Sequence, residues 1–116
     1  MNLYHVWFNL KPGVRDMEFA RHLKSFLSHL EGEGRIAGFR LTRCKLGLRP
    51  SELREFHLMI ETKDLTQLDA AFTSAASREG LVERLHAAVN QSATDVMFAL
   101  YRDFPDEIRV EGEEQF

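Results

Sequence analysis

Two short stretches with large side chains on both faces constrain the fold of this chain more than any other feature. Residues 3–10 and 56–61 alternate as β-strands do, with successive side chains on opposite faces. One row of each stretch is apolar, whereas the other is mixed. The mixed rows comprise Leu3, His5, Trp7 and Asn9 in the first stretch and His57, Met59 and Glu61 in the second. Because exposing either face to water is unfavourable, we expect both strands in the middle of a sheet.

The rest of the chain alternates between helical and strand patterns. Apolar residues recur at helical spacing over 16–31, in a segment that opens at residue 64, and over 81–90 after an interruption at 77–80. Asp16 is expected to cap the first helix, and Asp64 with Gln67 forms a variant of the capping box at the second. The predicted strands are 3–10, 36–46, 54–62 and 94–103.

The order of these elements is β-α-β-β-α-β, which is the ferredoxin-like split βαβ arrangement. Right-handed crossovers then set the strand order 4-1-3-2 in a four-stranded antiparallel sheet. The two strands in the middle of this order are the two-sided ones, which supports the assignment. The predicted fold class is therefore α+β and ferredoxin-like, with the helices on one face of the sheet.

Two helical regions can cover only one face of such a sheet. The helix-facing rows are predicted to be Tyr4, Val6 and Phe8; Phe39 and Leu41; Phe56, Leu58 and Ile60; and Val96, Phe98 and Leu100. The other face would then expose a larger apolar patch than soluble monomers usually leave in water. We therefore expect a homodimer in which two open sheet faces stack, as in a dimeric α+β barrel.

Candidate site residues gather on this open face. The pleat allows two registers: His5 opposite His57, or His5 opposite Met59 with Trp7 opposite His57. Near-neutral imidazoles beside aromatic rings suit general acid–base catalysis on a flat organic substrate. The candidate catalytic residues are His5 and His57, and the candidate ligand-binding residues are Trp7, Asn9, Arg40, Met59, Glu61, Met97 and Tyr101.

These residues also have plainer interpretations. The histidines can hydrogen-bond within a dimer interface, and metal binding would need His5, His57 and Glu61 to converge without a supporting spacing motif. Arg40 can pair with Glu61 across two strands, or it can hold a substrate carboxylate. We predict no metal site and no cofactor.

Length and charge limit the partners. A chain of 116 residues with one cysteine is one domain suited to a reducing setting, so we expect a cytoplasmic protein. It has no long apolar run and no secretory signal pattern, and we expect no membrane partner. The segment 105–116 holds five acids and one base, and the remaining 14 bases and 13 acids give no basic excess for nucleic acid. We expect a folded domain over 1–104 and an acidic tail over 105–116.

A family resemblance is carried by residues 3–14, 38–43, 55–60 and 98–103. On these segments the chain resembles the dimeric α+β-barrel superfamily and, within it, a small bacterial family of unknown function. The superfamily includes cofactor-free monooxygenases, muconolactone-type isomerases, stress-responsive proteins and relatives of haem-dependent peroxidases. The resemblance implies the fold and a dimer. No motif carries over catalytic residues from a characterised branch, so a function drawn from it is analogy.

Three functions stay open at this stage. The first is a dimer that binds or transforms a small aromatic or polyketide-like molecule without a cofactor, as a monooxygenase or an isomerase would, in a pocket between the sheet and either the helices or the neighbouring subunit. The second is a non-enzymatic stress-related or regulatory module, and the third is haem binding through His5 or His57. A cavity lined by the two histidines, Trp7 and Tyr101 would favour the first function. A filled interface with both histidines hydrogen-bonded would favour the second.

Overall fold

The computed structural model describes residues 1–76, 87 and 89–113 of the chain. Its elements are β1 (Asn2–Leu10), α1 (Asp16–Gly32), β2 (Gly38–Arg43), β3 (Phe56–Thr62), α2 (Leu65–Ala76) and β4 (Ala93–Arg102). They follow the predicted β-α-β-β-α-β order, although β2 and β3 are shorter than their patterns predicted. The interruption predicted at 77–80 and most of the helix predicted over 81–90 lie outside the described residues.

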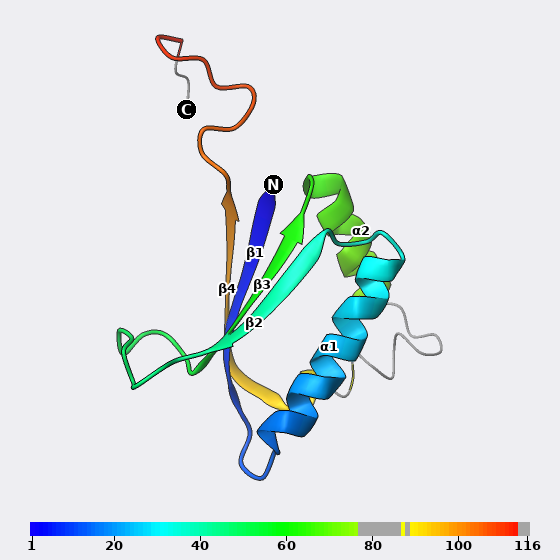
Figure 1. Ribbon diagram of the computed structural model, residues 1–116, viewed down its shortest axis with the longest axis vertical. Coiled ribbons are helices and arrows are strands. Elements are labelled where there is room, and N and C mark those ends of the chain that lie inside the picture. Colours follow the sequence, from blue (N-terminus) through cyan, green and yellow to red (C-terminus); the bar gives the residue numbers. More distant parts are fainter. Residues whose placement is uncertain (77–86, 88, 114–116) are drawn as a thin grey trace.

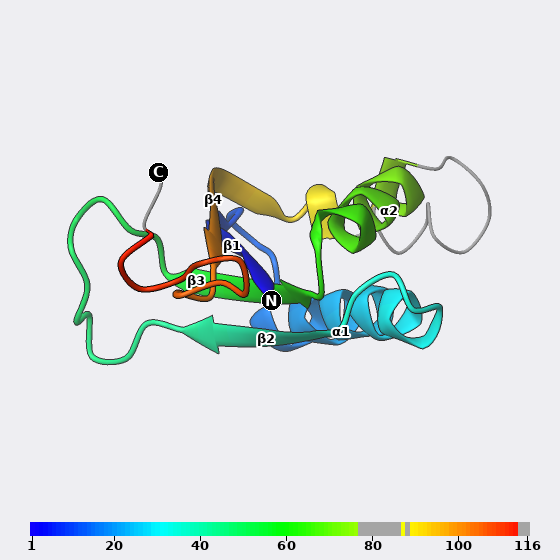
Figure 2. The same cartoon turned by 90° about the horizontal axis from the view of Figure 1, so that it is seen from above.

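The four strands form one antiparallel sheet in the order β2-β3-β1-β4, which confirms the predicted order 4-1-3-2 read from the other edge. The two-sided strands β1 and β3 are the central pair. Both helices lie on one side of the sheet, and the loop that joins β2 to β3 lies on the other side (Figure 1, Figure 2). We call this loop, residues 44–55, the hairpin loop.

The register of the two central strands is the second of the two alternatives. His5 lies opposite Met59, and Trp7 lies opposite His57. On the other edge of β1, a bulge between Trp7 and Asn9 shifts the pairing with β4. Bulges change the direction and twist of a strand, so the residue pairing between β1 and β4 after the bulge is offset from the pairing before it.

The core is built by α1 against the helix-facing rows of β1 and β3. Its apolar stripe is buried at five positions: Phe19, Leu23, Phe26, Leu27 and Leu30. The rings of Phe8 and Phe56 stack 5.5 Å apart on the sheet, and Phe19 tilts against Phe8 at 5.4 Å. These contacts fix the face of the sheet that α1 covers.

The two predicted helix caps have different outcomes. At the second helix, Asp64 accepts a hydrogen bond from the Gln67 amide at 2.8 Å, which confirms the forward half of the predicted capping box. The Gln67 side chain accepts from the Lys63 amide at 2.7 Å and not from the Asp64 amide, so the return bond is displaced by one residue. Asp16, in contrast, is the first helical residue of α1 and not its cap. The cap position is occupied by Arg15, which makes no side-chain capping bond, and Asp16 Oδ1 accepts from the Met17 amide.

The helix-facing row of β4 corrects a prediction. Val96, Phe98 and Leu100 share a face with Tyr4 and Val6, as predicted, because Tyr4 pairs with Leu100 and Val6 with Phe98. However, the three side chains are 41, 62 and 51% exposed. β4 is an edge strand, and the buried cluster is centred on α1, β1 and β3, so the described helical residues leave this row uncovered.

α2 is packed less completely than α1. The helical pattern of this segment predicts Leu65, Leu68, Phe72 and Ala75 on the apolar side. Of these, Leu68 is buried, whereas Leu65 and Phe72 are exposed, and Ala71 is buried in addition. The described part of α2 therefore packs against the sheet through Leu68 and Ala71 and leaves the Phe72 ring partly uncovered. Within residues 1–76, 87 and 89–113, no helix combines the length and the apolar character needed to cross a bilayer.

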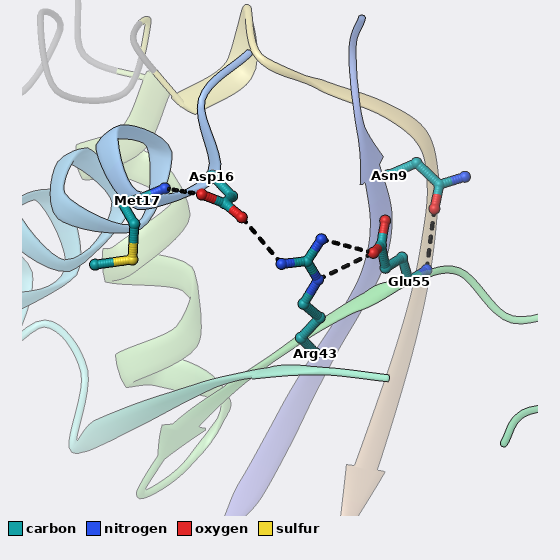
Figure 3. Close-up of polar contacts among 5 residues, drawn as sticks. All are labelled: Asn9, Asp16, Met17, Arg43 and Glu55. Atoms are coloured by element: carbon teal, nitrogen blue, oxygen red, sulfur yellow. Dashed lines mark hydrogen bonds and ion pairs between the residues drawn. The ribbon is translucent and has the colours of Figure 1, made fainter. Parts of the chain in front are cut away.

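Arg43, at the end of β2, joins the start of α1 to the base of the hairpin loop. Its guanidinium donates to Asp16 Oδ2 at 3.0 Å and to Glu55 Oε1 at 2.9 Å (Figure 3). Hydrogen bonds to Glu55 and Asp16 raise the pKa of Arg43. The guanidinium also lies over the Phe56 ring, 5.0 Å from its centroid. Sequence reasoning did not identify these ion pairs, because the partners lie 27 and 12 residues away along the chain.

Truncation of Leu27 tests the packing of α1. Leu27 is 1% exposed, so Leu27→Ala should lower the free energy of unfolding by about 3 kcal/mol through lost burial and the cavity left behind. Urea denaturation at a fixed protein concentration measures the loss. Met17→Ala on the same helix is the control, because Met17 is 79% exposed and its truncation should change stability by less than about 0.5 kcal/mol. Equal losses for both variants would contradict this packing.

Candidate functional site

Four aromatic side chains form a continuous cluster on the face of the sheet away from the helices. His5 stacks on Trp7 with ring centroids 5.6 Å apart and on His57 at 5.1 Å. Trp7 stacks on His57 at 4.9 Å, and Tyr101 of β4 meets His5 edge-on at 5.3 Å. We call these four residues the open-face cluster. It spans three strands because β1 lies between β3 and β4.

The two imidazoles of the cluster are joined by a hydrogen bond. Nδ1 of His5 lies 2.9 Å from Nε2 of His57. One of these nitrogens must carry the proton and the other must accept it, so the bond needs at least one neutral imidazole. Protonation of both rings would place two N–H groups against each other. The hydrogen bond is therefore disrupted when both rings are charged.

The electrostatic surroundings disfavour a charge on His57. Burial lowers the pKa of His57, and the adjacent imidazole of His5 lowers it further. The same face carries Arg40 on β2, Glu61 on β3 and Tyr101 on β4, while the helices pack on the opposite side. His57 therefore titrates at lower pH than a fully hydrated histidine.

The two predicted methionines flank the cluster. Met59 pairs with His5 and Met97 pairs with Trp7 across the two edges of β1, so both thioethers lie on the open face. Such side chains adapt readily to a neighbouring surface. Among the residues that the structure describes, no three His, Cys, Asp or Glu side chains lie close enough together to hold a metal ion.

Arg40 and Glu61 do not form the predicted cross-strand pair. Arg40 lies opposite Met59, whereas Glu61 lies opposite Gly38, two positions away along β2. A β-carbon at Gly38 would come within 3.2 Å of a Glu61 carboxylate oxygen, so the carboxylate occupies the space that glycine leaves. The prediction of an Arg40–Glu61 ion pair is wrong because this register offsets the two side chains.

Asn9, predicted to bind a ligand, is engaged by the chain around it. Its Oδ1 accepts from the Glu55 amide at 3.0 Å (Figure 3), and its Nδ2 donates to Asp95 Oδ2 at 3.2 Å. Asp95 has a φ of 55°, a left-handed conformation, where the β1–β4 pairing shifts. Asn9 thus joins the end of β1 to the hairpin loop and to β4 through both ends of its amide.

A cavity of about 270 Å³ lies on the other side of the sheet, between the strands and the helices. The space between the sheet and the helices was one of the two pocket positions expected from the sequence, but every candidate site residue was placed on the open face. Apart from Tyr4 and Asn90, the described residues that line it are apolar. They include Val6 of β1, Leu23 of α1, Ala71 and Phe72 of α2, and Phe98 of β4. We call this the helix-side cavity.

Tyr4 lies among aromatic rings at the edge of the helix-side cavity. Phe72 meets the Tyr4 ring edge-on at 5.1 Å, and Phe98 stacks on it at 5.8 Å. Phe72 and Phe98 both line the cavity and are exposed, so they border its opening. Burial raises the pKa of Tyr4, so its phenol stays neutral near pH 7 and can donate a hydrogen bond.

The sequence carried no signal that separates this cavity from a filled core. The row of Tyr4, Val6 and Phe8 was predicted to face the helices, and it does. Alternation of apolar and polar residues assigns a face, but it does not say how completely the facing helices fill the space. How far the space is filled is decided by the packing of the helices against the sheet.

Comparison with known proteins assigns the sequence to a family. A family model described as "Family of unknown function (DUF6614)" matches residues 1–116. No curated protein matches the sequence. Among solved structures, the chain is similar to a dimeric ferredoxin-like protein of unknown function from Jannaschia sp. CCS1, with 17% identity, a TM-score of 0.63, and coverage of 89% of this chain and 100% of that one.

Two further structures agree. At3g17210 from Arabidopsis thaliana has 10% identity and a TM-score of 0.67 over 95% of this chain and 100% of that one. A dimeric protein of unknown function and ferredoxin-like fold from Bacteroides fragilis NCTC 9343 has 16% identity and a TM-score of 0.56 over 88% and 95%. At such identities the likeness concerns the fold, and it confirms the ferredoxin-like class.

The lowered pKa of His57 predicts a loss of stability in mild acid. The imidazole has its ordinary pKa near 6.5 in the unfolded chain and a lower pKa in the folded one, so the unfolded state binds more protons between the two values. The stabilisation is complete above the unfolded value and falls as the pH drops towards the folded one. Urea denaturation at about pH 7.5 and about pH 5 measures this loss.

His57→Gln should flatten that pH dependence. His22→Gln on α1 is the control, because His22 lies on the other layer of the protein and its replacement should leave the slope in place. An unchanged slope in His57→Gln would mean that other groups cause the acid sensitivity.

Proposed function

The chain belongs to DUF6614, a family of unknown function, so we infer its activity from its own geometry. We propose that the protein is a homodimer and that each subunit binds a small aromatic molecule in its helix-side cavity. The observation that carries this proposal is the apolar cavity beside Tyr4. The open-face cluster is assigned to the contact between subunits. Binding and assembly thus use opposite faces of one sheet.

The size and lining of the cavity indicate the ligand class. About 270 Å³ is near the lower end of the range for small-molecule pockets, which suits a molecule of one or two rings. The aromatic rings of Phe72 and Phe98 at the opening favour a planar ligand, through offset or edge-on contacts. The Tyr4 hydroxyl supplies one oriented hydrogen bond. A hydrophobic aromatic molecule with a single polar substituent fits these features.

The homodimer is supported by the open face and by the structural neighbours. The proteins from Jannaschia and Bacteroides fragilis are described as dimeric. In this chain Tyr101 is 63% exposed, and the stacked rings beside it form a broad surface that no described helix covers. A second copy stacked on this surface would bury the same patch on both subunits, as a two-fold contact requires.

Proton transfer at the open-face cluster is the second candidate function. The hydrogen bond of 2.9 Å between the imidazoles of His5 and His57 favours it, because linked imidazoles can pass a proton. A substrate would then sit between subunits, against Trp7, Met59, Met97 and Tyr101, with Arg40 or Glu61 available to a polar group. The mutual hydrogen bond also fits a purely structural interface, so a ligand test must separate the two sites.

Ligand binding is tested with 2-naphthol as the fluorescent probe, followed by a small aromatic library. Ala71→Leu inserts a larger side chain into the helix-side cavity and should weaken binding at least roughly 10-fold. Ala70→Leu, one residue earlier on α2, is the matched control, because Ala70 does not line the cavity and its replacement should leave affinity unchanged. Fluorescence titration gives the dissociation constants, and melting curves verify folding.

The same titration distinguishes the two candidates. His5→Gln and His57→Gln should retain binding if the ligand occupies the helix-side cavity. Lost binding in these two variants with unchanged melting, while Ala71→Leu binds normally, would move the site to the open face. A wild-type protein that binds neither the probe nor any library member would overturn the binding proposal.

The homodimer is tested by a charge on the open face. Trp7→Glu should weaken dimerisation by about 100-fold or more, because the carboxylate would be buried against the partner without a compensating charge. Sedimentation velocity over a dilution series measures the effect. Met17→Glu on the exposed side of α1 is the control and should dimerise as wild type does. A wild-type protein that stays monomeric at micromolar concentration would refute the assembly.

A further inference from the structure

The segment after β4 is folded, yet it leaves large apolar side chains in water. The Asp106 carboxylate pairs with Arg102 at 3.5 Å and with Arg109 at 3.2 Å, which holds the chain in a turn. Phe104 and Ile108 are nevertheless 87 and 83% exposed. We call residues 103–113 the C-terminal arm. A folded segment with exposed apolar side chains is typical of a surface that a partner covers.

The C-terminal arm also carries negative charge that the subunit does not neutralise. Asp106 is occupied by its two arginines. Glu107, Glu111 and Glu113 are exposed, and none forms an ion pair with another residue that the structure describes. The arm therefore presents apolar side chains together with free carboxylates.

The hairpin loop has the complementary character. Leu46 and Leu48 are 82 and 79% exposed in its first half. They are flanked by Lys45 and Arg49, which are exposed and unpaired with any acid among the described residues. The loop is held in shape by backbone hydrogen bonds, including the one from the Leu48 amide to the Lys45 carbonyl at 3.1 Å. This part of the loop thus offers apolar side chains beside cations, whereas the exposed Glu52 lies three residues beyond Arg49.

These two surfaces cannot meet within one subunit as it is folded. The C-terminal arm leaves the sheet beside the start of β1, where Arg102 pairs with Asn2, and the hairpin loop leaves it beside the end of β1. The nine residues of β1 separate the two ends by about 30 Å. The arm and the loop project from opposite ends of the sheet in Figure 1, and both lie on the side away from the helices in Figure 2.

We propose that the C-terminal arm of each subunit docks on the hairpin loop of a second copy. The two sheets then stack so that β1 of one subunit and β1 of the other run in opposite directions. Charge complementarity and exposed apolar side chains on both segments carry this inference. It rests on the homodimer proposed above and adds its orientation. The contact is reciprocal, since a two-fold axis that crosses the strands brings both arm–loop pairs together.

The other face-to-face arrangement is disfavoured by the same charges. A two-fold axis parallel to the strands would place one arm beside the other and one loop beside the other. Acidic segments would then face acidic segments, and cations would face cations. Repulsion between like charges would weaken the association of the subunits. The apolar side chains of each segment would also be surrounded by charges of one sign.

Cross-linking tests the orientation directly. The single cysteine, Cys44, lies at the base of the hairpin loop, so Ile108→Cys adds one thiol on the arm. A short bismaleimide should join residue 44 of one subunit to residue 108 of the other, and peptide mass spectrometry identifies the joined residues. Mixing isotope-labelled and unlabelled subunits distinguishes links between subunits from links within one.

Two controls define the background. Wild type can form only 44–44 links, and the double variant Cys44→Ser/Ile108→Cys can form only 108–108 links. Both should cross-link poorly compared with Ile108→Cys alone. Efficient 44–44 and 108–108 links, with few 44–108 links, would overturn the proposed orientation.

A charge exchange tests the docking energy without new thiols. Glu107→Lys/Glu111→Lys should weaken dimerisation by roughly 10-fold, because each subunit then repels the hairpin loop of its partner. Lys45→Glu/Arg49→Glu should do the same. The variant that carries all four changes should recover the wild-type dissociation constant to within about threefold, since the pairs are restored with reversed sign.

Failure of this inference is distinguishable from failure of the dimer. Unchanged dimerisation in all three charge variants would refute the arm–loop contact and leave the homodimer standing. A monomeric wild type would refute both.

Discussion

The structure depends on β1, which is hydrogen-bonded along both edges and carries large side chains on both faces. One row packs towards α1 and α2 and the other builds the open-face cluster. A shift of one residue in its register would exchange the two rows and place the imidazoles in the core. The stacked rings of Phe8 and Phe56 on one face, and of Trp7 and His57 on the other, oppose such a shift. The same strand thereby fixes both candidate sites.

The sequence predicts the fold well because its signals are local and periodic. Alternation along β1 and β3, the helical stripe of α1 and the order of the elements leave little choice of topology once crossovers are right-handed. The sequence also narrowed the register to two alternatives, and the pairing of Trp7 with His57 selects one of them. Register depends on bulges and ring stacking between distant strands, which residue patterns within one strand do not contain.

The candidate site was less predictable because its features arise between elements. His5, Trp7, His57 and Tyr101 come together, as sharing one face implied, but Arg40 and Glu61 are offset by the β2–β3 register. Asn9 has the polarity of a binding residue, and the bulge instead places its amide against Glu55 and Asp95. The helix-side cavity depends on how the helices and the sheet pack against each other. Completeness of packing is a property of the assembled layers, so no single segment encodes it.

The two candidate sites are separated only by the thickness of one strand. Tyr4 lines the helix-side cavity, and the next residue, His5, carries the imidazole bonded to His57 on the open face. A ligand that moves the Tyr4 backbone must therefore also move the ring that meets a second subunit. If binding and assembly favour different positions of β1, each alters the affinity of the other by the same factor. A rigid β1, held at both edges, would instead leave binding and assembly independent. Titration of 2-naphthol at protein concentrations below and above dimer dissociation therefore measures how stiff this central strand is.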